Sequence, residues 1–207
     1  MLLPVIGLIQ VGEQSIADRY TYIPIIGLFI MIAWGTPDVI KRSRYRSEIL
    51  LVLTIVVIAI SSMVTWNQLK YWQNGFTLFQ HATDVTEKNC VAHYNLGAAL
   101  IDRGDVDGGI REFTLALAIN PNNAEVHNNL AIALDKKGDV YGAISEFKQS
   151  LKINPRNFET HYNLGIALLK NEVSEEAILE FRKALEIIPN ESRAQYYLGR
   201  ALANKNK

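Results

Sequence analysis

Three histidines recur at equal spacing in the second half of the chain. His93, His127 and His161 are separated by 34 residues each. Imidazole nitrogens are common ligands of zinc, so such a row first suggests a metal site. Equivalent helices of successive repeats lie roughly 10 Å apart, whereas a zinc–nitrogen bond is about 2.1 Å long. Three side chains at that spacing cannot share one ion, and we expect the histidines to be structural.

Cys90 is the single cysteine of the chain. It rules out an intramolecular disulfide and a cysteine-based metal cluster. No histidine or carboxylate stands beside it in the sequence to activate a thiolate. We therefore predict that the Cys90 thiol is buried or unreactive. We also predict no catalytic residue, no metal site and no cofactor on this chain.

The balance of charges also argues against a nucleic-acid partner. The 207 residues include 21 Lys and Arg and 21 Asp and Glu, so the formal net charge is zero. A nucleic-acid-binding protein normally carries a basic stripe or patch, so we expect no nucleic-acid partner. The 49% hydrophobic content argues against long-range disorder.

The 34-residue spacing extends to the residues that build a core. It relates Leu96, Leu130 and Leu164, then Phe113, Phe147 and Phe181, and then Pro121, Pro155 and Pro189. The units so defined are residues 90–123, 124–157 and 158–191. Each holds two amphipathic stretches followed by a proline that ends the second one. One helix pair cannot bury its apolar face alone, so the three units are predicted to stack around one continuous core.

This pattern resembles the tetratricopeptide repeat family, whose unit length and order of small and large residues it reproduces. The resemblance implies an all-α solenoid of three helix pairs. Residues 192–205 repeat a first helix and are predicted to cap the stack, giving a repeat domain over residues 90–207. Upstream, residues 68–89 match the second half of a unit, with Gly75, Phe79 and Ala82 in register, and are interpreted as a junction half-repeat.

In this family the first helix of each pair lines a concave binding face. By register, the resemblance implies peptide-binding side chains at Tyr94, Asn95, Asn128, Asn129, Tyr162, Asn163 and Tyr196. A row of asparagines is similar to the ladder with which some repeat-bearing glycosyltransferases hold an extended peptide, since an amide both donates and accepts hydrogen bonds. The alternative is a purely structural role for these asparagines. A lysine clamp for C-terminal carboxylates is not supported, because the fifth position of each unit holds Tyr or Asn.

The first third of the chain has long uncharged stretches. Residues 20–37 and 49–69 carry no charge, and about 20 apolar residues cross the roughly 30 Å hydrocarbon core of a bilayer. We predict two transmembrane helices, at about 20–37 and 48–67, within a membrane region of residues 1–67. The short loop between them is rich in Lys and Arg, which the positive-inside rule assigns to the cytoplasm. The repeat domain is then extracytoplasmic.

Residues 1–12 are apolar but too short to cross a bilayer. We interpret them as the last turns of a partial helix, which makes the chain the C-terminal portion of a longer membrane protein. An interfacial N-terminal segment is the alternative.

The segment from Asp18-Arg19-Tyr20 to Pro24 resembles an element near the last spans of protein O-mannosyltransferase-like integral-membrane glycosyltransferases. Members of that group use polyprenyl-phosphate sugars, and some carry C-terminal tetratricopeptide repeats. The resemblance implies that Arg19 contacts a lipid phosphate, for which a guanidinium is well shaped. An interfacial Asp18–Arg19 pair is the alternative. The family's catalytic carboxylate lies in an early loop that this chain does not match, so we do not expect this chain alone to be an enzyme.

Three functions remain open. The first is a membrane-anchored tetratricopeptide module for protein–protein interaction, which binds a peptide or protein partner outside the cytoplasm. The alternative is the C-terminal part of a polyprenyl-phosphate-sugar-dependent membrane glycosyltransferase, in which the repeat arm recruits the acceptor protein. The third is an assembly scaffold without peptide specificity.

Overall fold

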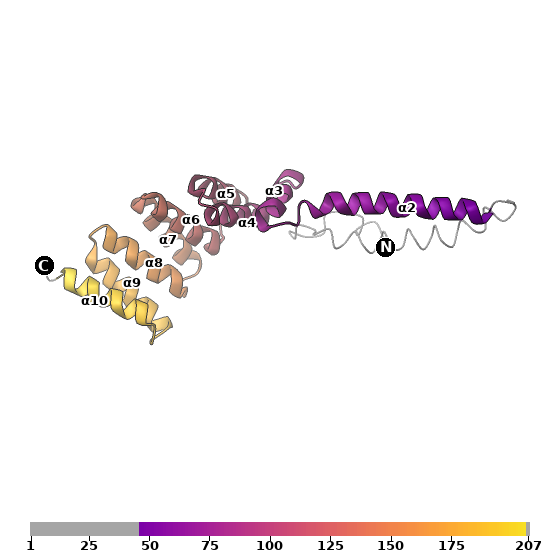
Figure 1. The fold of residues 1–207 in the computed structure, drawn as a ribbon. Helices are drawn as coiled ribbons and strands as arrows, with labels where there is room; N and C mark the ends of the chain where they lie inside the picture. The colour runs from indigo at the N-terminus through magenta and orange to yellow at the C-terminus, as the bar shows by residue number, and fades with distance from the viewer. Residues whose placement is uncertain (1–45, 206–207) are drawn as a thin grey trace. The chain divides into compact units, whose positions relative to one another are not determined.

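The structure is a computed structural model that describes residues 46–205, all of whose regular secondary structure is helical (Figure 1). The helices are α2 (Arg46–Leu69), α3 (Gly75–Val85), α4 (Cys90–Asp102), α5 (Val106–Ile119), α6 (Ala124–Lys137), α7 (Val140–Ile153), α8 (Phe158–Lys170), α9 (Ser174–Ile187) and α10 (Ser192–Lys205). The all-α prediction is confirmed for this part of the chain. By its contacts the chain divides into two compact units, Met1–Thr86 and Glu87–Lys207.

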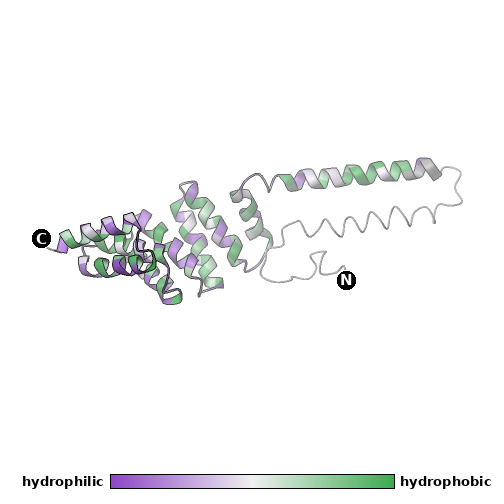
Figure 2. Cartoon of the chain, turned by 90° about the horizontal axis from the view of Figure 1, so that it is seen from below, coloured by the Kyte–Doolittle hydropathy of each residue, from purple (hydrophilic) through white to green (hydrophobic). Residues whose placement is uncertain are grey.

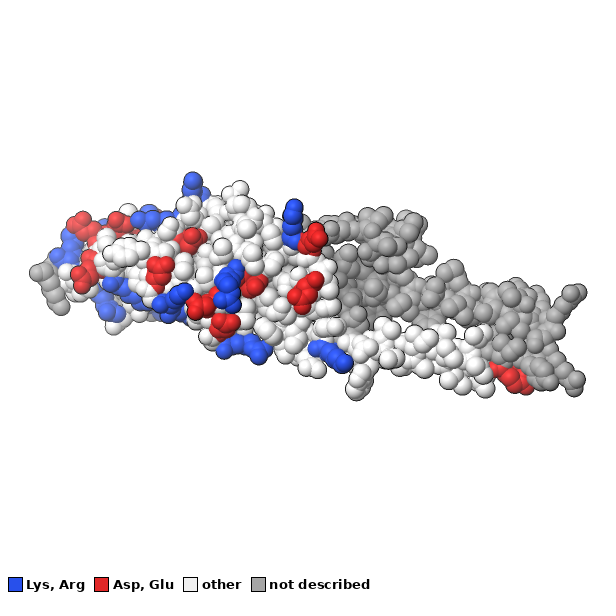
Figure 3. Space-filling model, turned by 90° about the horizontal axis from the view of Figure 1, so that it is seen from above, with Lys and Arg blue, Asp and Glu red and all other residues white. Residues whose placement is uncertain are grey.

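Helix α2 is long and apolar over most of its length (Figure 2). Leu51, Ile55, Ile58 and Met63 are each more than half exposed, and the visible face of the helix is almost free of charge (Figure 3). Taken over the described residues alone, none of the helices combines the length and the apolarity of a membrane span, so the span predicted at 48–67, which falls on α2, is not found. The predicted span at 20–37, the partial helix at 1–12 and Arg19 lie outside the described residues.

Helix α3 begins at a capping box. The side chain of Asn74 accepts a hydrogen bond from the backbone N–H of Thr77 at 3.0 Å, and the Thr77 hydroxyl lies 3.4 Å from the backbone nitrogen of Asn74. The His81 ring stacks on Tyr71, with the ring centroids 3.7 Å apart. None of the residues of α3 is buried.

Helices α4 to α10 form the solenoid, in which each helix packs mainly on its neighbours in sequence (Figure 1). The pairs are α4 with α5, α6 with α7, and α8 with α9, and α10 packs on α9. Five of these helices start at an Asn or Asp whose side chain accepts a backbone N–H of the first turn, as Asp105 does from Gly108 at 2.8 Å. Short side-chain acceptors are the preferred residues at this position because they satisfy N–H groups that have no partner within the helix.

A phenylalanine of each second helix fills the space inside its repeat. Phe113, Phe147 and Phe181 are at most 2% exposed. A Cβ atom at Gly165 would lie 2.7 Å from the Phe181 ring, and real Cβ atoms essentially never approach so closely. The helices of a pair therefore reach their spacing only because the facing residue is small. Leu134 packs against both buried clusters of the solenoid and joins them into one core.

The turn within each repeat needs a left-handed residue. Gly104 and Gly138 supply it in the first two repeats, with φ of +87° and +93°. The third repeat has no glycine in this turn, and asparagine is a residue type that adopts this conformation more readily than most. Even so, Glu172 adopts φ +61°, whereas Asn171 has φ −89°. Glu172 is the residue aligned with the two glycines, so the repeat register decided the position, at a steric cost of roughly 1–2 kcal/mol for a residue with a Cβ.

We expect Gly165→Ala to destabilise the solenoid by about 1–3 kcal/mol, because the added methyl overpacks the Phe181 ring. Gly199→Ala, at the equivalent position of α10, should be neutral or raise the free energy of unfolding by up to ~1 kcal/mol, since nothing lies within 4 Å of its Cβ position and alanine favours a helix. Urea unfolding followed by circular dichroism tests both. Equal losses in the two variants would contradict this account of the packing.

Candidate binding site on the first helices

The predicted binding residues come from equivalent turns of the first helices. We call this surface the first-helix face and define it by residues of α4, α6, α8 and α10: Tyr94, Asn95, Asn128, Asn129, Tyr162, Asn163 and Tyr196. The four helices begin at residues 34 apart, so the equivalent residues of successive helices follow one another along the stack. The structure divides the seven residues into two groups.

The first group connects neighbouring repeats. The Tyr94 hydroxyl donates to Glu125 Oε1 at 2.7 Å and accepts from Asn129 Nδ2 at 2.9 Å, so α4 is tied to α6. Burial raises the pKa of Tyr94 to about 12, helped by the hydrogen bond to Glu125 and its negative charge. The phenol therefore stays protonated and remains a donor at neutral pH.

The network continues from α6 to α8. Asn128 Nδ2 lies 3.4 Å from Asn129 Oδ1, and Asn128 Oδ1 accepts from Thr160 Oγ1 at 3.1 Å. Thr160 Oγ1 is 3.5 Å from Ser150 Oγ, which donates to the carbonyl of Ala124 at 2.7 Å. Ser150 and Thr160 are almost fully buried. A chain of polar contacts thus runs from the surface of the first repeat into the interior between the second and third.

Aromatic contacts replace this network at the C-terminal end. Tyr162 is only 8% exposed, and its ring meets that of Tyr197 edge-on at a centroid distance of 5.7 Å. The Arg193 guanidinium lies 5.3 Å from the Tyr162 ring centroid and 3.5 Å from Glu159. Helices α8 and α10 are therefore joined by edge-to-face aromatic and cation–π contacts.

The second group is not engaged by another repeat. Asn95 donates to the carbonyl of Val91 in its own helix at 2.7 Å. Asn163 is partly exposed and, within the described residues, its amide has no hydrogen-bond partner. Tyr196 is 64% exposed. Asn163 and Tyr196 are thus the predicted residues whose polar and aromatic groups are open to a ligand.

Sequence reasoning missed Glu125, Thr160, Ser150 and Arg193. Glu125 and Arg193 occupy the second position of their units, which faces the neighbouring first helix, so the register could have indicated them. Ser150 replaces the alanine found at its position in the other repeats, Ala116 and Ala184. A hydroxyl at a core position is a signal, because buried hydroxyls require a partner.

The histidines couple the two helices of each repeat. Their Nδ1 atoms lie 2.6–2.7 Å from a glutamate of the second helix, in the pairs His93–Glu112, His127–Glu146 and His161–Glu180. The Nε2 atoms of His127 and His161 are also 3.0 Å from the carbonyls of Pro121 and Pro155. Each ring has its own glutamate within its repeat, and His127 and His161 also contact the proline near the end of the preceding unit. In the described part of the chain, no group of three His, Cys, Asp or Glu residues could hold a metal ion.

Glu180 is the most buried carboxylate of these pairs. Burial by itself would raise its pKa, but hydrogen bonds from His161 and Lys183, with the charge of Lys183, bring the pKa below its ordinary value. Glu180 is therefore ionised at neutral pH within the repeat.

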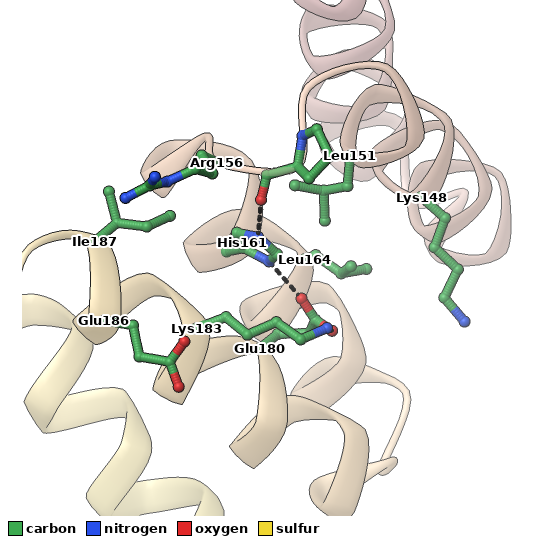
Figure 4. A pocket seen from close by; sticks show the side chains of 10 residues that line it. Lys148, Leu151, Arg156, His161, Leu164, Glu180, Lys183, Glu186 and Ile187 are labelled. Carbon is green, nitrogen blue, oxygen red and sulfur yellow. Dashed lines mark hydrogen bonds and ion pairs between the residues drawn. The ribbon is translucent and has the colours of Figure 1, made fainter.

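A pocket of about 600 Å³ lies among α7, α8 and α9, away from the seven predicted residues (Figure 4). His161 and Glu180 line it, and Lys148, Arg156 and Lys183 lie around them. Lys148 pairs with Glu176 at 3.2 Å and Lys183 with Glu180 at 2.9 Å. Because two of its three cations already have carboxylate partners, the pocket offers less to a ligand than the first-helix face does.

Sequence profiles described as TPR repeat or tetratricopeptide repeat match residues 90–123, 112–144, 136–172 and 158–191. The chain is a tetratricopeptide repeat protein. Proteins built from this repeat form interaction modules for other proteins.

Two curated human relatives match about half of this tetratricopeptide repeat protein. Protein O-mannosyl-transferase TMTC4 is 24% identical over 98 residues, which are 47% of this chain and 13% of TMTC4. Protein O-mannosyl-transferase TMTC3 is 26% identical over 101 residues, which are 49% of this chain and 11% of TMTC3. The match thus spans only a small part of either relative.

Solved structures share the fold. A crystal structure of MamA is 20% identical with a TM-score of 0.60, covering 62% of this chain and 75% of that one. The first TPR domain of Spaghetti (RPAP3), bound to the HSP90 peptide SRMEEVD, is 20% identical with a TM-score of 0.57, covering 59% and 98% of the two chains.

We expect Glu180→Gln to lower the free energy of unfolding by about 1.5–3 kcal/mol at neutral pH, the typical contribution of hydrogen bonds to a charged group. Because the folded pKa of Glu180 lies below its unfolded value, its contribution is complete above the unfolded pKa and is lost as pH falls through the folded pKa. The difference between wild type and variant should therefore shrink in acid. Urea titrations over a pH series measure it, with the exposed Glu186→Gln on the same helix as control. A difference that is constant with pH would refute the assignment.

Proposed function

We propose that the protein is a membrane-anchored module whose first-helix face binds an extended peptide segment of a partner protein. The main support for the proposal is that the residues of the first-helix face fall into two groups. Tyr94, Asn129 and Tyr162 hold neighbouring repeats together. The Asn163 amide has no hydrogen-bond partner among the described residues, and the Tyr196 ring, which contacts Tyr197 and Arg200 of its own helix, is 64% exposed. A rigid framework with a few exposed polar and aromatic groups is suited to peptide capture, since little order must be created on binding.

The distance between successive first helices fits an extended peptide. Successive first helices are roughly 10 Å apart, which is the length of about three residues of extended chain. A side-chain amide such as that of Asn163 can donate to and accept from a peptide backbone, and the Tyr196 ring offers apolar contact at the next helix. The Spaghetti (RPAP3) domain of the same fold holds a peptide, which supports this mode of binding at the level of the fold.

The anchor is proposed from the sequence of α2 and the exposure of its side chains. Ile49–Trp66 comprises 18 uncharged residues. The exposed apolar side chains of α2 are unfavourable in water and favour an apolar environment. Trp66 and Trp72 lie where an interfacial aromatic belt is expected. With the basic loop that precedes α2 inside, the repeats would lie outside the cytoplasm.

The second candidate is a role within a glycosyltransferase. It is favoured by the two protein O-mannosyl-transferases that match the chain. In that case the first-helix face would recruit the acceptor protein, a polyprenyl-phosphate sugar would be the donor, and Arg19 would contact the lipid phosphate. A catalytic half would have to be supplied from outside residues 1–207.

We expect Asn163→Ala and Tyr196→Ala to weaken peptide binding about tenfold each (~1.4 kcal/mol), with unchanged thermal stability. Asn129→Ala is the matched control for a structural asparagine: it should lower the free energy of unfolding by about 1 kcal/mol. The probe is the tightest peptide selected by phage display on the wild-type chain, with binding measured by fluorescence anisotropy. Unchanged binding by both of the first two variants would refute the first-helix face as the site.

The proposed membrane anchor predicts that charged substitutions in α2 move the chain out of the membrane fraction. Ile55→Arg combined with Ile58→Arg should shift the chain from the carbonate-resistant membrane pellet to the supernatant, because two charges in an apolar helix oppose insertion. Leu179→Arg, an exposed position of α9, should leave the chain in the pellet. A wild-type chain found in the supernatant would refute the anchor.

Orientation is tested separately. In a Cys90→Ser background, Tyr141→Cys places a thiol at a position that is 75% exposed. An extracytoplasmic repeat domain predicts labelling by a membrane-impermeant maleimide in intact cells, and labelling only after lysis would reverse the orientation.

A further inference from the structure

Two of the structural histidines have a hydrogen-bond acceptor at each nitrogen of the ring. The Nδ1 atom of His127 lies 2.6 Å from Glu146 Oε2, and its Nε2 atom lies 3.0 Å from the carbonyl oxygen of Pro121. In the next repeat His161 repeats both distances with its own glutamate and proline. A backbone carbonyl and a carboxylate accept hydrogen bonds and have no proton to donate. Each ring therefore lies between two acceptors.

The corresponding position of α10 indicates which group the proline carbonyl requires. It holds Gln195, whose side-chain amide donates to the carbonyl oxygen of Pro189 at 3.1 Å. The nitrogen of an amide is a donor only. Three successive proline carbonyls thus contact a side-chain nitrogen of the following first helix, so Nε2 of His127 and of His161 is assigned as an N–H donor.

A neutral imidazole carries a single N–H. With that proton on Nε2, the bare Nδ1 atom would face a carboxylate oxygen 2.6 Å away, and such an unsatisfied contact costs free energy. We propose that the pairs His127–Glu146 and His161–Glu180 each hold one additional proton between ring and carboxylate in the folded chain at neutral pH. Because each pair titrates as a unit, folding of the repeats is coupled to proton uptake.

A ring that donates at both nitrogens connects three segments of the solenoid. His161 lies on α8, Glu180 on α9 and Pro155 in the turn that follows α7, and Figure 4 shows both contacts. Without the additional proton, an acceptor faces an acceptor at one end of the ring. The joint between the second and third repeats therefore weakens as pH rises, and His127 makes the joint between the first and second repeats depend on pH in the same way.

The charges around the two rings differ. The charged groups beside His161 come from every element packed on it and are Lys148, Arg156, Glu180, Lys183 and Glu186. The corresponding positions 34 residues earlier, around His127, hold Thr114, Asn122, Glu146, Gln149 and Lys152. A like charge nearby disfavours a protonated ring. Since one cation rather than three surrounds it, His127 is the better position for a substitution.

His93 provides an internal control. Its Nδ1 atom lies 2.7 Å from Glu112 Oε2, but among the described residues its Nε2 atom has no acceptor. Glu87 stands where the other units have a proline. A neutral ring with its proton on Nδ1 satisfies this contact, so the pair in the first repeat needs no additional proton.

Nitrogen-15 NMR of the histidine side chains counts these protons directly. The full chain in detergent micelles is measured at about pH 7.5, well above the value near 6.5 at which a free histidine loses its second proton. Both ring nitrogens of His127 and of His161 should resonate as N–H nitrogens, whereas His93 should show one nitrogen without a proton. A bare ring nitrogen in either His127 or His161 would overturn the proposal.

Urea unfolding gives a second measurement. Above about pH 6.5 the unfolded chain has released these protons and the folded chain retains them, so the unfolding equilibrium constant should rise with pH, by up to about tenfold per pH unit for each pair. His127→Gln, which keeps an amide donor like that of Gln195, should remove one of these two factors between about pH 7 and 8. His93→Gln should leave the pH dependence unchanged. The same pH dependence in wild type and His127→Gln would refute the proton linkage.

Discussion

The contact between a phenylalanine of the second helix and a small residue of the first is the constraint on which this solenoid depends. Phe113, Phe147 and Phe181 are almost completely buried. The facing residue is glycine in the first and third repeats, where even a Cβ atom would overlap the ring, and alanine in the second. This contact sets the distance between the paired helices. It thereby sets the outward direction of every other side chain on them, including those of the first-helix face.

Polar contacts then fix one repeat against the next. Tyr94, Glu125 and Asn129 join the first helices of repeats one and two, and Asn128 with Thr160 joins the next two. Buried polar groups are costly unless paired, so these contacts favour a single arrangement of the stack. The same residue types that the family uses for ligands here hold the framework in place. In the proposed function a ligand would therefore use the groups that do not join repeats, chiefly Asn163 and Tyr196.

The sequence by itself determined the helices, their pairing and the core, because the 34-residue period repeats contacts that lie within one unit, such as His161 with Glu180. The same register predicted the binding face. The tertiary structure decided which of the predicted residues join one repeat to the next. Tyr94 bonds residues 31 and 35 positions away, and such contacts depend on the angle between repeats, which no local pattern encodes. The choice of Glu172 for the left-handed turn followed the register, whereas intrinsic preference favoured Asn171, because the packed helices on both sides fix where the chain must turn.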